Sequence, residues 1–166
     1  MANKTTGSYR QVLVRVRRIT RQLTHHNWRP QVIIADFQMA LWNVVETELP
    51  TTTLSGCYFH LTQSFWRKIQ EFGLARSYRM NQRLQDTVKK FMAIGYLPIP
   101  LLRNNLRELE QSRRTHRLGN DFPALQDCLN YVGNTYIHPD ATYPPTAWNV
   151  HNRNMAQRTN NHAENE

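Results

Sequence analysis

Two short runs, each introduced by a proline, are the segments of this chain with the pattern of β-strands. Val32–Asp36 follows Pro30 and is rich in β-branched residues, and Thr51–Cys57 follows Pro50. Elsewhere, apolar residues recur at helical spacing. Since two strands alone make a poor sheet, the sequence predicts either a mostly α protein or an α/β sheet that has lost strands.

Helical periodicity covers most of the remaining chain. Residues 9–23 form an amphipathic pattern that Thr5, Thr6 or Ser8 can cap. Arg113–Arg117 is predicted to be a basic loop, and the chain from His138 onward is predicted to be irregular. The other expected helices are Gln38–Leu49, a stripe from Leu61 to Phe72 ended by Gly73, a stripe from Leu84 to Met92 ended by Gly95, a helix with Pro98 and Pro100 in its first turn that continues to Leu109, and a helix opened by Asp121 and Pro123 that continues to Tyr136.

Charge is the strongest compositional signal among the 166 residues. Lys and Arg number 21 against 12 Asp and Glu, which gives a formal net charge of +9 and a pI near 10.1. This bias favours nucleic acid or another polyanion as a partner, and an inert basic surface is the alternative. Two cysteines provide no disulfide framework and favour a reducing compartment. The sequence shows no membrane-spanning stretch and no signal peptide.

Basic residues gather in three places that could contact DNA phosphates. The helix at 9–23 is rich in arginine, a second helix mixes aromatic and basic residues, and a third place is the Arg113–Arg117 segment. In the second helix the aromatic residues follow the core stripe, so only the bases that lie off it are candidates. A solvated helix face is the alternative interpretation. The candidates are Arg15, Arg18, Arg67, Lys68, Arg113 and Arg114.

Asp36 ends the first strand-like run and is the first acid of the chain. A carboxylate at the tip of a buried strand is a common way to present a metal ligand, although it also suits a solvated loop. Cys57 and His60, three residues apart, could supply half of a zinc site, but no second pair with such spacing exists. The alternative is a buried cysteine beside a histidine that bonds locally.

The end of the chain offers a second carboxylate. Thr159 or Asn160 can cap a helix that would hold Glu164 in its first turns, and a disordered tail is the alternative. Together with Asp36, Glu164 suggests a cluster that holds two divalent ions about 4 Å apart for phosphoryl transfer. Hard oxygen ligands in basic surroundings favour Mg or Mn.

The order of these segments resembles the catalytic domain of Mutator-like element (MULE) transposases, over essentially the whole chain. Four separated blocks carry the resemblance, and the opening Asn3–Tyr9 also matches the stretch before that family's first core helix. The blocks are Pro30 with Val32–Phe37, Gly56–Gln63, Arg67–Leu74 and Arg158–Glu164.

The resemblance implies a ribonuclease-H-like fold with a helical insertion and a DDE triad. Asp36 matches the second acid, Glu164 the third, and Cys57 and His60 the family's Cys-x-x-His motif. The chain would be one partial domain: a core at 1–57, an insertion at 58–136 and a return segment at 137–166. Intact relatives would cleave and join DNA with Mg or Mn in the nucleus, as homo-oligomers on transposon ends.

The first acid of the triad is the main departure from that family. Residues 1–35 contain no Asp or Glu, so this ligand is expected upstream of Met1. A chain without it is expected to lack autonomous strand transfer, because both ions share these ligands. The second hypothesis is a domesticated, non-catalytic DNA-binding or regulatory module, and the third is a small zinc-dependent structural domain.

Overall fold

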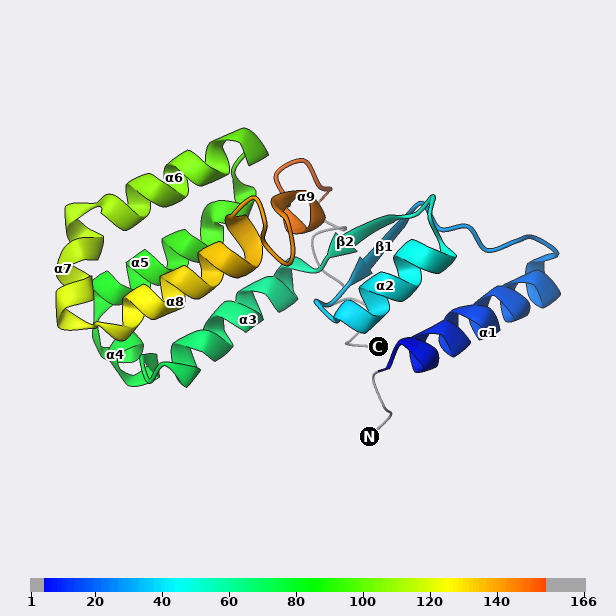
Figure 1. Ribbon diagram of the computed structural model, residues 1–166, viewed down its shortest axis with the longest axis horizontal. Coiled ribbons are helices and arrows are strands. Elements are labelled where there is room, and N and C mark those ends of the chain that lie inside the picture. The colour runs from blue at the N-terminus through cyan, green and yellow to red at the C-terminus, as the bar shows by residue number, and fades with distance from the viewer. Residues whose placement is uncertain (1–4, 155–166) are drawn as a thin grey trace. The chain divides into compact units, whose positions relative to one another are not determined.

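A computed structural model describes residues 5–154, apart from the side chain of Arg114 (Figure 1). These residues form two compact units that divide between Gly56 and Cys57. We call residues 5–56 unit 1 and residues 57–154 unit 2. Unit 1 combines helices with a small sheet, whereas the regular elements of unit 2 are helical throughout its described residues.

Unit 1 contains four elements in the order helix, strand, helix, strand. They are α1 (Thr6–Thr24), β1 (Val32–Ala35), α2 (Met39–Glu48) and β2 (Thr53–Gly56). The sequence predicted all four, with ends that differ by at most three residues. Thr5 caps α1, since its hydroxyl oxygen accepts a hydrogen bond from the Ser8 amide, and α1 ends at His25, whose φ is 58°.

The two strands pair in parallel, from Val32 opposite Thr53 to Ala35 opposite Gly56. Parallel neighbours need a crossover connection, which α2 provides by covering one face of the sheet (Figure 1). A small parallel sheet among helices is compatible with the predicted α/β class. The described residues contain no further strand, so the predicted ribonuclease-H-like core stays a prediction.

The core of unit 1 lies where α1 and α2 meet the sheet. Its buried members are Leu13 from α1 and Val44, Val45 and Leu49 from α2 and its end. Partly buried side chains extend this cluster toward the sheet and the connection before β1. They are Tyr9, Trp28, Ile33, Leu41 and Leu54.

Unit 2 begins with α3, whose apolar stripe packs beside α8 (Figure 1). At its end, Gly73 adopts a φ of 71°, in the left-handed region that favours glycine. The Leu74 amide then bonds to the Ile69 carbonyl at 2.9 Å, which closes the helix end. The elements are α3 (Tyr58–Glu71), α4 (Ala75–Met80), α5 (Gln82–Ala93), η1 (Ile94–Tyr96), α6 (Ile99–Gln111), α7 (Arg113–Asp121), α8 (Ala124–Val132), η2 (Gly133–Ile137) and α9 (Pro145–Trp148).

Trp148, the last residue of α9, is fully buried in unit 2. Its indole nitrogen donates to the main-chain oxygens of Tyr136 and Tyr143, each at 3.0 Å. The ring also contacts the Tyr136 ring edge-on at 6.5 Å. Trp148 therefore fixes the segment after α8 both by packing and by hydrogen bonds.

Two expectations for unit 2 are wrong. Arg113–Arg117 is not a loop but the first half of α7, because Ser112 caps that helix and Thr115 and Leu118 bury its inner side. Asp121 does not cap the next helix, since it is the last residue of α7. The segment after His138 is also less irregular than expected, because α9 forms within it.

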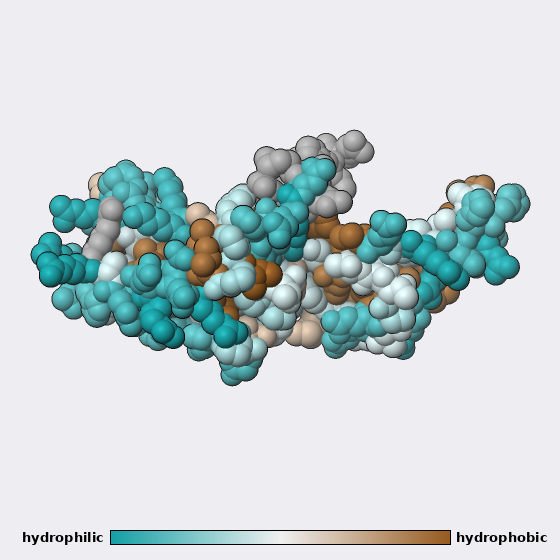
Figure 2. Space-filling model, turned by 90° about the horizontal axis from the view of Figure 1, so that it is seen from above, coloured by the Kyte–Doolittle hydropathy of each residue, from teal (hydrophilic) through white to brown (hydrophobic). Residues whose placement is uncertain are grey.

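The surface is mainly hydrophilic, with separate hydrophobic patches on the face seen in Figure 2. Exposed apolar side chains of unit 1 include Val12, Val14 and Leu23 of α1, of which Leu23 is 77% exposed. Among the described residues, every helix is too short or too polar to cross a bilayer.

Candidate nucleic-acid interface and metal ligands

Asp36 directly follows β1 and is half-buried. Its main-chain oxygen accepts a hydrogen bond of 2.7 Å from the indole nitrogen of Trp42. The ring of Phe37 stacks on that indole with 6.1 Å between centroids. Two aromatic residues thus fix the backbone that presents the Asp36 carboxylate at the carboxyl end of the strand.

The metal site expected from Asp36 is not complete within residues 5–154. No group of three or more His, Cys, Asp or Glu side chains in this part of the chain could hold a metal ion. Asp36 supplies one hard oxygen donor, whereas a two-ion site needs several carboxylates. The described residues therefore do not by themselves fit such a site. Glu164, the predicted partner, lies outside the described residues.

Cys57 and His60 stand at the start of α3. Cys57 occupies the N-cap position and is fully buried, and His60 is half-buried in the first turn. Burial lowers the pKa of the Arg153 guanidinium, while Cys57 acts to raise it, so these two side chains interact electrostatically. The described residues of unit 2 add no further ligand for the predicted zinc site.

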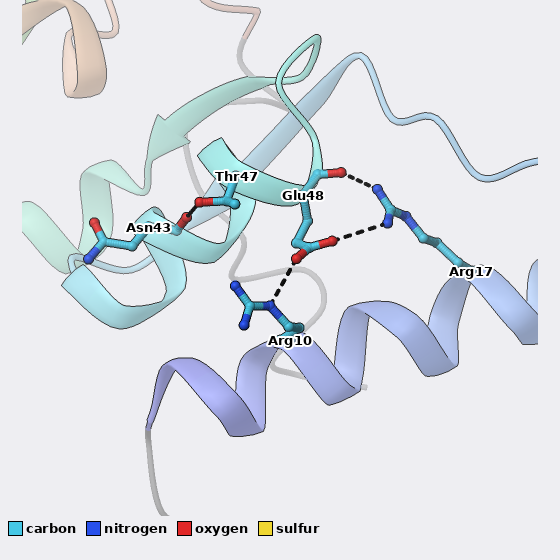
Figure 3. A network of polar contacts seen from close by, with 5 residues as sticks. All are labelled: Arg10, Arg17, Asn43, Thr47 and Glu48. Atoms are coloured by element: carbon cyan, nitrogen blue, oxygen red, sulfur yellow. Dashed lines mark hydrogen bonds and ion pairs between the residues drawn. The ribbon is translucent and has the colours of Figure 1, made fainter.

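Arginines of α1 are arranged in two groups around the helix. Arg10 and Arg17, two turns apart, both reach Glu48 at the end of α2 (Figure 3). The Arg10 Nε lies 2.9 Å from the carboxylate and the Arg17 Nη1 lies 3.5 Å from it. Arg17 also donates to the Glu48 main-chain oxygen. This group attaches α1 to α2.

Arg15 and Arg18 form the outward group of α1 and are exposed. They border a shallow groove of about 480 Å³ that also includes Arg10 and Val14. No ion pair among the described residues neutralises either of them. Both predicted DNA contacts on α1 are therefore free to meet phosphates.

Arg67 and Lys68 of α3 differ in how available they are. Arg67 is exposed and donates to the Gln63 side chain at 2.7 Å. The Lys68 ammonium forms an ion pair with Glu71 at 2.7 Å and lies 4.6 Å from the centre of the Tyr131 ring. The hydrogen bond to Glu71 raises the pKa of Lys68. Of the two predicted contacts, Arg67 is the better placed for DNA.

Arg113 lies in the first turn of α7 and borders a depression of about 580 Å³. Arg83 of α5 and Arg117 of α7 share it, and Asp121 partly offsets their charge. The side chain of Arg114 is outside the described residues. The interface predicted at this place is thus a helical surface rather than a loop.

The basic surface of unit 1 also contains residues that were not predicted from the sequence. Arg21 of α1 and the pair Trp28 and Arg29 before β1 line one pocket together with Arg17 and Arg18. The four-residue spacing of Arg17 and Arg21 predicts a shared helix face, but nothing in the sequence places Arg29 opposite them.

Comparison with protein families matches residues 1–64 to the MULE transposase domain. The match includes unit 1 and the start of α3, and thus Asp36, Cys57 and His60. The resemblance stated for residues beyond 64 stays a prediction. Neither the curated proteins nor the solved structures contain a match to this chain.

Proposed function

We propose that this chain is transposase-derived, binds DNA through the arginine-rich surface of unit 1, and contributes Asp36 to a DDE-type metal site. The observation that carries the proposal is the position of Asp36 directly after a parallel strand, inside the segment that matches the MULE transposase domain. The net charge of +9 supports a polyanionic partner.

Basic residues are concentrated near Asp36 in the sequence. All seven Lys and Arg residues of the first 56 positions precede it, against three acids in the same stretch. Such a surface attracts the phosphate backbone without regard to sequence, which supports DNA as the polyanionic partner. DNA as substrate would make the nucleus the site of action in a eukaryotic cell.

Duplex binding tests the first half of the proposal. Fluorescence anisotropy with a 30-base-pair duplex across a salt series should give a slope of log affinity on log salt of about −0.9 per phosphate contact. Arg15→Gln should reduce that slope by about 1. Arg76→Gln, an exposed arginine on α4, is the charge-matched control and should leave it unchanged. Absence of duplex binding at low salt would refute this function.

Manganese binding tests the second half. In the proposed site Asp36 and Glu164 would hold a divalent ion, and the third acid of the triad would be one that residues 1–35 do not contain. Asp36→Asn should weaken Mn²⁺ binding to the DNA complex, as measured by electron paramagnetic resonance. Glu46→Gln, an exposed acid on α2, should not. Equal Mn²⁺ affinity in both variants would show that Asp36 is not a ligand of the ion.

A non-catalytic DNA-binding module is the second candidate. The packing of α1 against α2 through Leu13 favours it, because a basic helix held on a core binds DNA without any metal. This candidate expects no effect of Asp36→Asn on Mn²⁺ binding. Both candidates expect no strand cleavage by the chain alone, so Mg²⁺- or Mn²⁺-dependent nicking that Asp36→Ala abolishes would contradict both.

A further inference from the structure

A basic pocket of about 740 Å³ lies within unit 1 and shares Arg18 with the outward groove of α1. The second half of α1 forms one wall, the segment before β1 forms another, and the turn after α2 closes it. Its volume falls in the range of sites that enclose a small molecule or one unit of a polymer. We call it the Trp28 pocket.

The charge of the Trp28 pocket is strongly positive. Arg17, Arg18, Arg21 and Arg29 line it, together with one acid, Glu48. The Glu48 carboxylate already pairs with Arg10 and Arg17 (Figure 3). Among the described residues, no acid pairs with the other three arginines, which are exposed. Three guanidinium groups without counter-charges, around one pocket, match the oxygens of phosphate groups.

Trp28 supplies the aromatic part of the pocket. The side chain is half-buried and packs against the cluster that contains Leu13 and Leu49, so its position is fixed by the core. The remaining surface of the indole faces the pocket. A fixed indole beside phosphate-binding arginines can stack on a nucleobase or contact a sugar, as in proteins that bind single strands.

We propose that the Trp28 pocket binds one nucleotide of a DNA strand at an unpaired position, with its phosphates on Arg18, Arg21 and Arg29 and its base on Trp28. The inference rests on the DNA binding proposed above and names where one strand is held. A base inside a duplex has both faces stacked on neighbours, so it reaches an indole only when it leaves the stack. The pocket should therefore favour unpaired DNA.

The test compares a labelled 12-nucleotide single strand with the matched duplex, using the full chain and fluorescence anisotropy. Trp28→Leu should weaken single-strand binding by about 5- to 160-fold, which is the range for loss of one stacked base. Duplex binding should change by less than about twofold. Trp28→Phe keeps an aromatic ring and should retain most of the affinity. Circular dichroism confirms that each variant is folded.

Arginine variants test the phosphate contacts. Arg29→Gln should weaken single-strand binding and reduce its salt slope by about 0.7, the value for one contact on a single strand. Arg103→Gln on α6 removes the same charge from an exposed position in unit 2 and should have no such effect. Unlabelled strand should displace the labelled strand, whereas inorganic phosphate at the same concentration should not.

The outcomes separate this inference from the proposed function. Suppose that the wild type binds duplex and that wild type, Trp28→Leu and Arg29→Gln bind the single strand equally well. This result would overturn the nucleotide site in the Trp28 pocket and leave the proposed function intact. Absence of binding to either DNA would overturn both. If inorganic phosphate displaces the labelled strand as effectively as unlabelled strand does, the pocket is a site for free anions and the inference is overturned.

Discussion

Units 1 and 2 differ in how their basic residues are arranged relative to their apolar cores. In unit 1, Arg15, Arg18, Arg21 and Arg29 lack acidic partners among the described residues, and the apolar cluster beneath them is small. In unit 2, Lys68 is paired with Glu71 and Arg153 is half-buried, while exposed arginines such as Arg67, Arg76 and Arg103 lie on separate helices. Unit 1 thus combines unpaired arginines around one pocket with a small core, whereas unit 2 has many more buried apolar residues.

Among the variants that test this difference between the units, Trp148→Ala should cause the largest loss of stability, and it should do so in unit 2. Removing a fully buried indole costs about 3–5 kcal/mol, and two main-chain oxygens lose their donor. Hydrogen exchange with mass spectrometry should show lost protection in peptides of unit 2. Phe59→Ala is the control, since Phe59 is 39% exposed. Equal loss of protection in unit 1 would show that the two units unfold together.

Alkaline pH should also lower the stability of unit 2 more than that of unit 1. Burial raises the pKa of Cys128 to about 11 and raises the pKa values of Tyr58 and Tyr136. The native state keeps these groups neutral while the unfolded chain ionises them, so stability is complete below about pH 9 and declines as pH rises toward 11.

The expected loss of unfolding free energy is roughly 1–3 kcal/mol between pH 8 and pH 10.5. Urea unfolding at pH 8 and pH 10.5, followed by exchange in peptides of unit 2, measures it. Tyr136→Phe should reduce the pH dependence, because it removes one of the titrating groups. Stability of unit 2 that is unchanged between these two pH values would contradict the assignment of buried neutral groups.

The smallest effect should come from Glu48→Gln in unit 1. Its ion pairs with Arg10 and Arg17 are partly exposed, so the loss in stability should stay below about 1 kcal/mol. DNA affinity should rise by a few fold at low salt, since Arg17 is released to phosphates. Glu46→Gln removes a charge outside the pocket, and an equal rise in that variant would mean that only net charge matters.

Much of unit 1 was predictable because local signals agree there. Pro30 and Pro50 mark the ends of elements, and β-branched residues distinguish Val32–Ala35 from the helices on either side. In unit 2 the local signal failed at Arg113–Arg117. That run has few apolar residues, and its helical state depends on the Ser112 cap and on burial of Thr115 and Leu118.

The candidate site was predictable only in part. Asp36 was found because it follows a strand directly, which is a local pattern. The Trp28 pocket was not found, because Arg29 meets Arg18 and Arg21 only after α1 packs against α2. Tertiary packing, rather than any spacing in the sequence, brings these side chains together.

The parallel pairing of β1 and β2 sets an order of events during folding. Pairing of β1 with β2 is a non-local contact that needs the chain to cross back through α2, and such pairing is slower than helix formation, which takes about a microsecond. Strand pairing is therefore the late step in unit 1. During synthesis, Asp36 leaves the ribosome well before Gly56, so its carboxylate takes its native position only after the following strand has been made.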